Sequence, residues 1–323
     1  MNPASQATAT ISTADGTLLS LTRHGDASAT SAVILCHGFI QNARAWSVPS
    51  RSLIDALVAD GHAVYAINLR DRDFGERKVR AKIGHDLKDT VDEDAVAIVD
   101  AVGARHPNVG WVGHSMGGLI GATLPSDTAR RLRAVVVVGT PLTPGRRPLR
   151  HRAIVAALSL FGRRLGKRGV PFDGQRYGLG FVVGQRFMDH PFAAYAPLPL
   201  WKAGSFSAAD LRHTLTHAFD TDSHNVLADL VDMIASNGAR AGRLPVRERL
   251  QLLTAPMLAI GGTDDALAPA DTVEALLQQT SSSSKRFVAV DAGHIDLIIG
   301  AAAPSTVWPP IRAFLNEHLG QQA

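Results

Sequence analysis

The 323-residue chain predicts an α/β fold in which a mostly parallel central sheet is flanked by helices. Two observations carry this prediction. Short β-rich runs alternate with helical patterns along most of the chain, and the run from Ala134 to Val138 is continuously apolar. Such a β-branched run is typical of a central parallel strand buried on both faces, and strand–helix–strand alternation places helices over the sheet. The composition, 46% hydrophobic and 19% charged, supports a large core and excludes a disordered chain.

The first half of the chain divides into elements at clear turn signals. The pair Asp15-Gly16 between two β-rich runs predicts a hairpin. A helix is expected over 51–60, because Gly61 provides a C-terminal stop. A second helix is expected over 90–105, where acidic residues in the first turn complement the helix dipole. The expected strands are 11–12, 18–22, 33–36, 63–68, 109–113 and 133–138.

One long segment interrupts this alternation. Between Thr140 and Leu253 the sequence contains helical patterns and loops but no convincing strand, and it carries ten of the eighteen aromatic residues. This concentration suggests a small separate core or a lid over an apolar pocket. We therefore expect a core formed by residues 1–140 and 254–323, with a helical cap inserted at 141–253. Two strands at 255–260 and 286–290 and a helix at 304–319 complete the core.

The strongest chemical signal is Gly113-His114-Ser115-Met116-Gly117-Gly118, which follows an expected strand and opens an expected helix. A sharp strand-to-helix turn exposes a serine hydroxyl at the helix N-terminus, as a nucleophile elbow requires. Gly113 and Gly117 let the neighbouring backbone pass close by. Ser115 is therefore the candidate nucleophile, and the amide of Met116 is placed to face a developing oxyanion.

With this motif the sequence resembles the α/β-hydrolase superfamily, over nearly the whole chain apart from the expected cap. The resemblance implies a nucleophile, an acid and a histidine in that chain order. His294 follows the last expected strand, in Asp291-Ala292-Gly293-His294-Ile295, and would serve as general base and then acid.

The acid would lie in the segment from Gly261 to Pro269, where two adjacent aspartates compete. The family pattern G-x-x-D-x-x-x-P fits Asp265 through the glycine three residues before it and Pro269. Asp264 fits only the glycine half of the pattern, and a loop-ordering or capping role is its simpler interpretation. We favour Asp265, although the sequence leaves open whether Asp264 can replace it.

The turn His37-Gly38-Phe39-Ile40 resembles the family's His-Gly-x pattern after an early strand. It implies the amide of Phe39 as the second oxyanion donor, beside that of Met116. His37 and Gly38 are expected to order this loop, and His37 is not expected to titrate in catalysis. His114 stands at the variable position of the elbow, where packing under the loop is the simplest interpretation.

Further motif comparisons reduce the number of reaction types that fit the sequence. The segments around Asp265 and His294 are similar to polyhydroxyalkanoate synthases, which show comparable Asp-x-x-Ala-Pro and Gly-His-Ile patterns but carry a cysteine in the elbow. Serine at this position favours hydrolysis over polymer synthesis, and it excludes the aspartate elbow of haloalkane dehalogenases and epoxide hydrolases. The turn 70–75 departs from the Arg-Gly-x-Gly-x-Ser-like turn of many relatives, which leaves the shape of the pocket open.

Composition excludes several function classes. The net charge is +4, but no zinc-ligand spacing, RNP-like aromatic motif or heptad array accompanies it, so no nucleic-acid partner is expected. No apolar run reaches 18 residues, the first ten residues lack signal-peptide features, and Cys36 is the single cysteine. These features favour a cytoplasmic protein. Cys36 lies in an apolar run, so we expect a small buried hydrophobe. Serine chemistry needs no metal or organic cofactor, and none is expected.

The expected cap contains a strongly basic stretch. Eight arginine or lysine residues and no acid lie between Pro141 and Val170, around the apolar run 153–161. Three interpretations stay open. The stretch could be a solvated helix with one face on the cap core, a helix that contacts an anionic lipid surface peripherally, or a cradle for the phosphates of an acyl-CoA.

The sequence therefore predicts a lidded serine carboxylesterase or lipase-like hydrolase that acts on hydrophobic esters. In this hypothesis Ser115 attacks the acyl carbonyl, His294 moves the proton and Asp265 orients His294. The first alternative is an acyltransferase or thioesterase acting on acyl-CoA. The second is a catalytically silent ligand-binding relative, against which the presence of all three residues argues.

Overall fold

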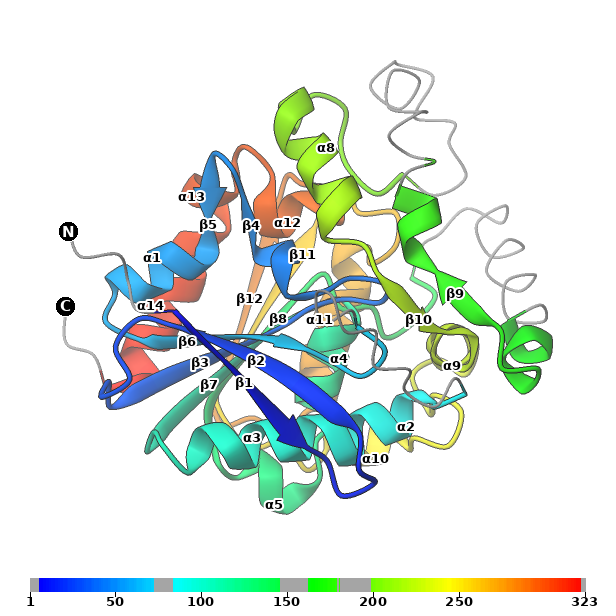
Figure 1. Ribbon diagram of the computed structural model, residues 1–323, viewed down its shortest axis with the longest axis horizontal. Coiled ribbons are helices and arrows are strands. Elements are labelled where there is room, and N and C mark those ends of the chain that lie inside the picture. The colour runs from blue at the N-terminus through cyan, green and yellow to red at the C-terminus, as the bar shows by residue number, and fades with distance from the viewer. Residues whose placement is uncertain (1–5, 73–83, 146–161, 179, 181–198, 321–323) are drawn as a thin grey trace.

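The centre of the molecule is an eight-stranded sheet with the order β1-β2-β6-β3-β7-β8-β11-β12 (Figure 1). The computed structural model describes residues 6–72, 84–145, 162–178, 180 and 199–320. Six strands, from β6 to β12 across the sheet, run parallel, and β1 and β2 form the expected hairpin at one edge. The strands are β1 Ala7–Ser12, β2 Leu18–His24, β3 Ser31–Cys36, β6 Ala63–Asn68, β7 Asn108–His114, β8 Leu132–Val138, β11 Met257–Gly262 and β12 Lys285–Val290.

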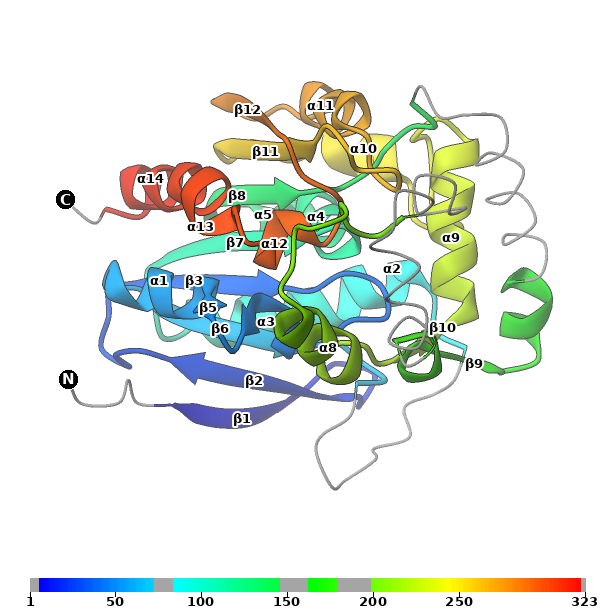
Figure 2. The ribbon, with the colours of Figure 1, turned by 90° about the horizontal axis from the view of Figure 1, so that it is seen from above.

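Helices cover both faces of this sheet (Figures 1 and 2). Alternate residues of a strand point to opposite faces, so in β3 Ile34 packs in one apolar cluster and Leu35 in the other. One face carries α1 Leu53–Ala59, α12 Asp296–Ile299, α13 Ala303–Thr306 and α14 Trp308–Leu319; the other carries α3 Val96–Gly103, α4 Met116–Ala122, α10 Val246–Leu250 and α11 Ala270–Gln279. The predicted fold class is confirmed.

Element boundaries differ from the prediction at several places. The helix expected over 90–105 starts earlier, as α2 Leu87–Asp89, and continues through a π-helical turn, Thr90–Ala95, into α3. The last helix is divided at Val307 into α13 and α14. Two short elements, the 3-10 helix Ala43–Trp46 and α5 Ser126–Ala129, and a two-residue strand pair, β4 Ser47–Val48 and β5 Arg51–Ser52, were not expected.

The expectation that 140–253 holds no strand is wrong. β9 Pro171–Asp173 pairs antiparallel with β10 Thr221–Ser223. Three residues are too few to show the period of two by which a strand is recognised in a sequence. The region also contains helices, among them α8 Ala208–His217 and α9 His224–Ala235, in addition to α10.

The segment 141–253, for which a cap is expected and which is called the cap below, contacts the rest of the chain, called the core, in two ways. Side chains of α9, α10 and the loop between them pack in the same apolar cluster as one face of the sheet. A separate small cluster joins α8 to the residue after His294; its members are Trp201, Leu211, Leu215, Phe219 and Ile295. The boundaries at 141 and 253 stay a prediction. The apolar run 153–161 and four of the eight basic residues of this stretch lie outside the described residues, whereas Arg163, Arg164, Lys167 and Arg168 lie within them. No helix within the described ranges is both long and apolar enough to cross a bilayer.

Candidate active site

Ser115 stands at the turn between β7 and α4, and its backbone has φ 52° and ψ −116°. A non-glycine residue in this region is strained and persists only where its surroundings fix it. The Ser115 amide donates to Val138 O at 2.8 Å, and the Ser115 carbonyl accepts from Gly118 N at 3.1 Å and from Thr140 Oγ1 at 2.9 Å. The elbow is therefore held by the ends of two adjacent parallel strands.

The glycines of the elbow allow backbone segments to approach each other. A Cβ atom on Gly113 would lie 2.2 Å from Gly117 O, and one on Gly117 would lie 2.2 Å from Cys36 O. No side chain fits at such distances. The turn between β7 and α4 therefore needs glycine at both positions, which is the steric reason for the motif.

His294 and Asp265 meet at the neighbouring strand ends. Asp265 follows β11 and is 3% exposed, and its Oδ2 lies 2.7 Å from His294 Nδ1. The other carboxylate oxygen, Oδ1, accepts from the amides of Leu267 and Ala268 at 2.8 and 2.7 Å. With Nδ1–H donated to Asp265, Nε2 of the ring is the free acceptor, as a general base requires.

Asp264 points elsewhere. Its side chain is about half exposed and forms an ion pair with Lys202 at 3.0 Å. Of the two aspartates, Asp265 alone hydrogen-bonds to His294 within the described structure.

The His294 loop is supported by a second buried carboxylate. Asp296 accepts from Gly293 N at 2.7 Å, from Lys202 N at 2.8 Å and from Ser205 Oγ at 2.7 Å. Burial raises the pKa of Asp296. A Cβ on Gly293 would lie 2.8 Å from Lys202 N, so glycine lets the cap segment reach this loop. Asp296 therefore joins the His294 loop to the cap.

The loop after β3 is ordered by His37 and Gln41. His37 Nδ1 donates to Gly38 O at 2.9 Å, and His37 Nε2 accepts from Leu69 N at 3.3 Å. Burial lowers the pKa of His37 well below its usual value, so the ring is neutral. The Gly38 amide donates to Gln41 Oε1 at 3.0 Å. This network shapes the turn that carries Phe39.

His114 is buried beneath the same loop. Its Nδ1 lies 3.0 Å from Gln41 Oε1, and its Nε2 lies 3.1 Å from His294 O. Burial and the nearby His294 lower the pKa of His114 well below its usual value. A neutral imidazole carries one N–H and donates to only one of these acceptors. His114 thus links the loop that carries Phe39 and Gln41, the turn at Ser115 and the His294 loop.

Ser115 and His294 line one cavity of about 110 Å³. Its wall is mostly apolar and comes from three loops and the cap: Phe39, Ile40, Leu200, Phe219, Leu267 and Ile295. Among the described residues no group of three His, Cys, Asp or Glu side chains is arranged to hold a metal ion. Cys36 is fully buried and burial raises the pKa of its thiol, which makes it unreactive.

A family model described as the alpha/beta hydrolase family matches residues 33–305. The chain belongs to the α/β hydrolase family. A protein of Variovorax paradoxus (strain S110) named "Putative carbamate hydrolase RutD" is 27% identical over 249 residues, which are 76% of this chain and 78% of that protein.

Solved α/β hydrolase structures share the fold at low identity. A monoacylglycerol lipase of Paleococcus ferrophilus has a TM-score of 0.62 and 16% identity over 97% of this chain and 99% of its own. An enol-lactonase of Burkholderia xenovorans LB400 has a TM-score of 0.60 and 16% identity over 95% and 100%. At this identity the likeness shows the fold alone. The similarity to polyhydroxyalkanoate synthases stays a prediction.

Sequence reasoning missed Gln41, Asp222 and Asp296. Gln41 accepts from Gly38 and lies against His114, Asp296 supports the His294 loop, and Asp222 contacts the loop that carries Phe39. None stands in a motif with fixed spacing. The one signal for Asp296 is its position two residues after His294.

Proposed function

We propose that this α/β hydrolase cleaves carboxylic esters through Ser115, His294 and Asp265. The observation that carries the proposal is the hydrogen bond between His294 Nδ1 and Asp265, with His294 and Ser115 on the wall of one cavity. Such an arrangement of nucleophile, base and orienting carboxylate supports acyl transfer.

In this proposal His294 Nε2 takes the Ser115 proton as the hydroxyl oxygen attacks the acyl carbonyl. The amides of Phe39 and Met116 stabilise the resulting oxyanion. His294 then protonates the leaving alcohol, and an acyl-enzyme remains on Ser115. Water attacks this ester, again with His294 as base, and releases the acid.

The cavity supports a small apolar acyl group. Its volume of about 110 Å³ lies well below the ~300–1,000 Å³ typical of ligand pockets, and six apolar side chains line it. This favours esters with a short hydrocarbon acyl chain at this subsite. The names of the lipase and the lactonase with the same fold are consistent with ester chemistry at such a site.

The test is hydrolysis of p-nitrophenyl esters of increasing acyl length by wild type and Ser115→Ala. Wild type is expected to turn over short apolar esters, and the variant to lose at least ~10⁴-fold in kcat. Ser126→Ala, which alters a serine at the start of a different helix, is the matched control and should keep full activity. A fluorophosphonate probe should label wild type and not Ser115→Ala.

Two outcomes would replace the proposal. If acyl-CoA is cleaved far faster than esters, or an added alcohol becomes acylated in preference to water, the enzyme is a thioesterase or acyltransferase. If no acyl substrate, including a carbamate, is turned over and the probe does not label Ser115, the chain is a silent binding protein.

A further inference from the structure

The loop 38–42, which carries the proposed oxyanion donor Phe39, is joined to the cap segment 217–222. The amide of Asp220 donates to Ile40 O at 2.8 Å, and the amide of Ile40 donates to Asp222 Oδ2 at 3.1 Å. The amide of Asn42 donates to Ala218 O at 3.0 Å. The cap therefore satisfies the polar backbone groups on one side of this loop.

Ile40 needs such support because its backbone is strained. Its φ is 52°, in the left-handed region that β-branched residues rarely adopt. A conformation of this kind persists only when surrounding contacts determine it. Both the amide and the carbonyl of Ile40 are bonded to the cap. The peptide groups on both sides of Ile40 are thus each held by one hydrogen bond from outside the loop.

Arg72 ties the same loop to the same cap segment. Its Nε donates to Gln41 O at 2.6 Å, and two other guanidinium nitrogens donate to Thr221 O at 2.6 Å and to Asp222 Oδ2 at 2.5 Å. The side chains of Arg72 and Asp222 are each 1% exposed. A planar guanidinium can make all three contacts at once, whereas a lysine could not reproduce this fork.

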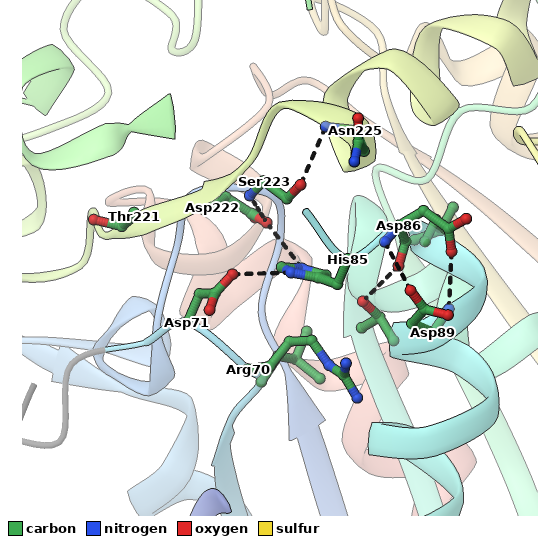
Figure 3. Close-up of polar contacts among 12 residues, drawn as sticks. Arg70, Asp71, His85, Asp86, Asp89, Thr221, Asp222, Ser223 and Asn225 are labelled. Atoms are coloured by element: carbon green, nitrogen blue, oxygen red, sulfur yellow. Dashed lines mark hydrogen bonds and ion pairs between the residues drawn. The ribbon is translucent and has the colours of Figure 1, made fainter. Parts of the chain in front are cut away.

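The second oxygen of Asp222 has partners of its own. Oδ1 accepts from Ser223 N at 2.8 Å and lies 3.8 Å from His85 Nε2. His85 Nδ1 lies 2.9 Å from Asp71 Oδ2, so Asp222 sits between cap and core groups (Figure 3). Both oxygens of this carboxylate are therefore engaged.

We propose that Asp222 and Arg72 are positioning residues that hold the loop 38–42 in the geometry in which the Phe39 amide stabilises the oxyanion. This inference rests on the proposed function. The oxyanion forms only after attack by Ser115, so loosening the loop weakens binding of the tetrahedral species and leaves ground-state binding of the ester largely intact.

Asp222→Asn tests this, with Asp210→Asn as the matched control. Asp210 is also a buried cap carboxylate paired with a core arginine, Arg51, at 3.1 Å, and its partners lie outside the loop 38–42. Asp222→Asn is expected to lower kcat for the best ester about 10- to 100-fold, somewhat less than loss of a whole oxyanion donor, and to change KM less than about twofold. Affinity for a trifluoromethyl ketone, which forms a tetrahedral adduct with Ser115, should fall by the same factor as kcat.

Hydrogen exchange supplies a readout that does not depend on turnover. The Ile40 amide should exchange faster in Asp222→Asn than in wild type and stay protected in Asp210→Asn. If both variants lose kcat equally, the effect is general loosening of the cap and the proposal is wrong. Unchanged ketone affinity in Asp222→Asn would also overturn it.

A double variant covers the case in which Asp222→Asn does not fold. Arg72→Met/Asp222→Leu removes both buried charges, which proteins often tolerate, but leaves Ile40 N without its carboxylate acceptor. We expect the same loss of kcat and ketone affinity, with Arg51→Met/Asp210→Leu as control. A double variant with wild-type kcat contradicts the inference alone, whereas a wild type inert toward all acyl substrates removes the proposed function and this inference with it.

Discussion

Asp265 and Asp222 are both buried carboxylates that accept backbone amides, but their partners lie at very different distances along the chain. Asp265 accepts from Leu267 and Ala268, two and three residues on. Asp222 accepts from the Ile40 amide, 182 residues away. The position of the Asp265 side chain is set by its own loop at a strand end. The position of the Asp222 side chain depends on how the cap packs against the core. A site residue whose partners are close in the sequence can be recognised from the sequence, whereas one whose partners are distant segments brought together by folding cannot.

The largest effect is expected where the local carboxylate is altered. Asp265→Asn should lower kcat for ester hydrolysis about 10⁴-fold, because an amide no longer holds His294 in the tautomer that accepts a proton at Nε2. Asp264→Asn should change kcat less than about twofold, since Asp264 pairs with Lys202. Steady-state kinetics of both variants check this. Equal losses in the two would mean that the acids exchange roles in solution.

The contrast between local and distant partners also explains which parts of the fold and of the candidate site could be predicted from the sequence. Ser115, Asp265 and His294 lie one, three and four residues after the ends of the parallel strands β7, β11 and β12, and the carboxyl ends of parallel strands meet at one edge of the sheet. Among the core strands, β6 has the predicted bounds, 63–68. The pairing of Ile40 with Asp222 has no such rule, because it depends on the path of the chain through the cap. The strands β9 and β10 were missed for a different reason, because three residues are too few to show the period of two by which a strand is recognised.

A smaller effect, on stability, is expected at another contact between cap and core. Asp229 of α9 accepts from Leu87 N at 3.1 Å. Burial, with the neighbouring Asp86 and Asp232, raises the pKa of Asp229 to about 6. The folded protein then binds more protons here than the unfolded chain does between about pH 4 and 6. The free energy of unfolding therefore falls as pH rises through this window.

Asp229→Asn removes the destabilisation that the buried, charged carboxylate causes at higher pH, and its side-chain oxygen can still accept from Leu87 N. At pH 8 the variant should be more stable than wild type by about 2–3 kcal/mol, from about 1.4 kcal/mol per pKa unit, and at pH 5 the gain should be about half as large. Urea unfolding at the two pH values measures both. A variant less stable than wild type at pH 8 would show that the charged carboxylate stabilises this contact.

The third effect concerns the junction between the cap and the His294 loop. In Asp296→Asn a neutral amide replaces the carboxylate, so the hydrogen bonds from Gly293 N and Lys202 N lose their charged acceptor and the Ser205 hydroxyl has to turn to accept from the new NH2 group. We expect kcat to fall about tenfold. Ser205→Ala removes only the hydroxyl and should cost less than about threefold. If Asp296→Asn keeps full activity, the cap does not position the His294 loop, and the loop 38–42 is then the part of the site that the cap positions.

The smallest effect is expected from a substitution in the wall of the cavity that leaves the hydrogen bonds of Asp265 intact. Leu267 lines the cavity with its side chain, while only its backbone amide bonds to Asp265. Leu267→Ala therefore enlarges the space beside Ser115 and leaves the Asp265 contact in place. The preferred acyl chain should lengthen by one to three carbons, with kcat/KM at the new optimum within about tenfold of wild type, because a methylene in an apolar pocket is worth only ~1–3 kcal/mol. The p-nitrophenyl ester series measures the shift. Asp264→Asn is the surface control and should keep the wild-type optimum. If Leu267→Ala also keeps the wild-type optimum, the acyl chain lies against the cap residues Leu200 and Phe219 instead. The cap would then determine substrate specificity as well as the geometry of the loop 38–42.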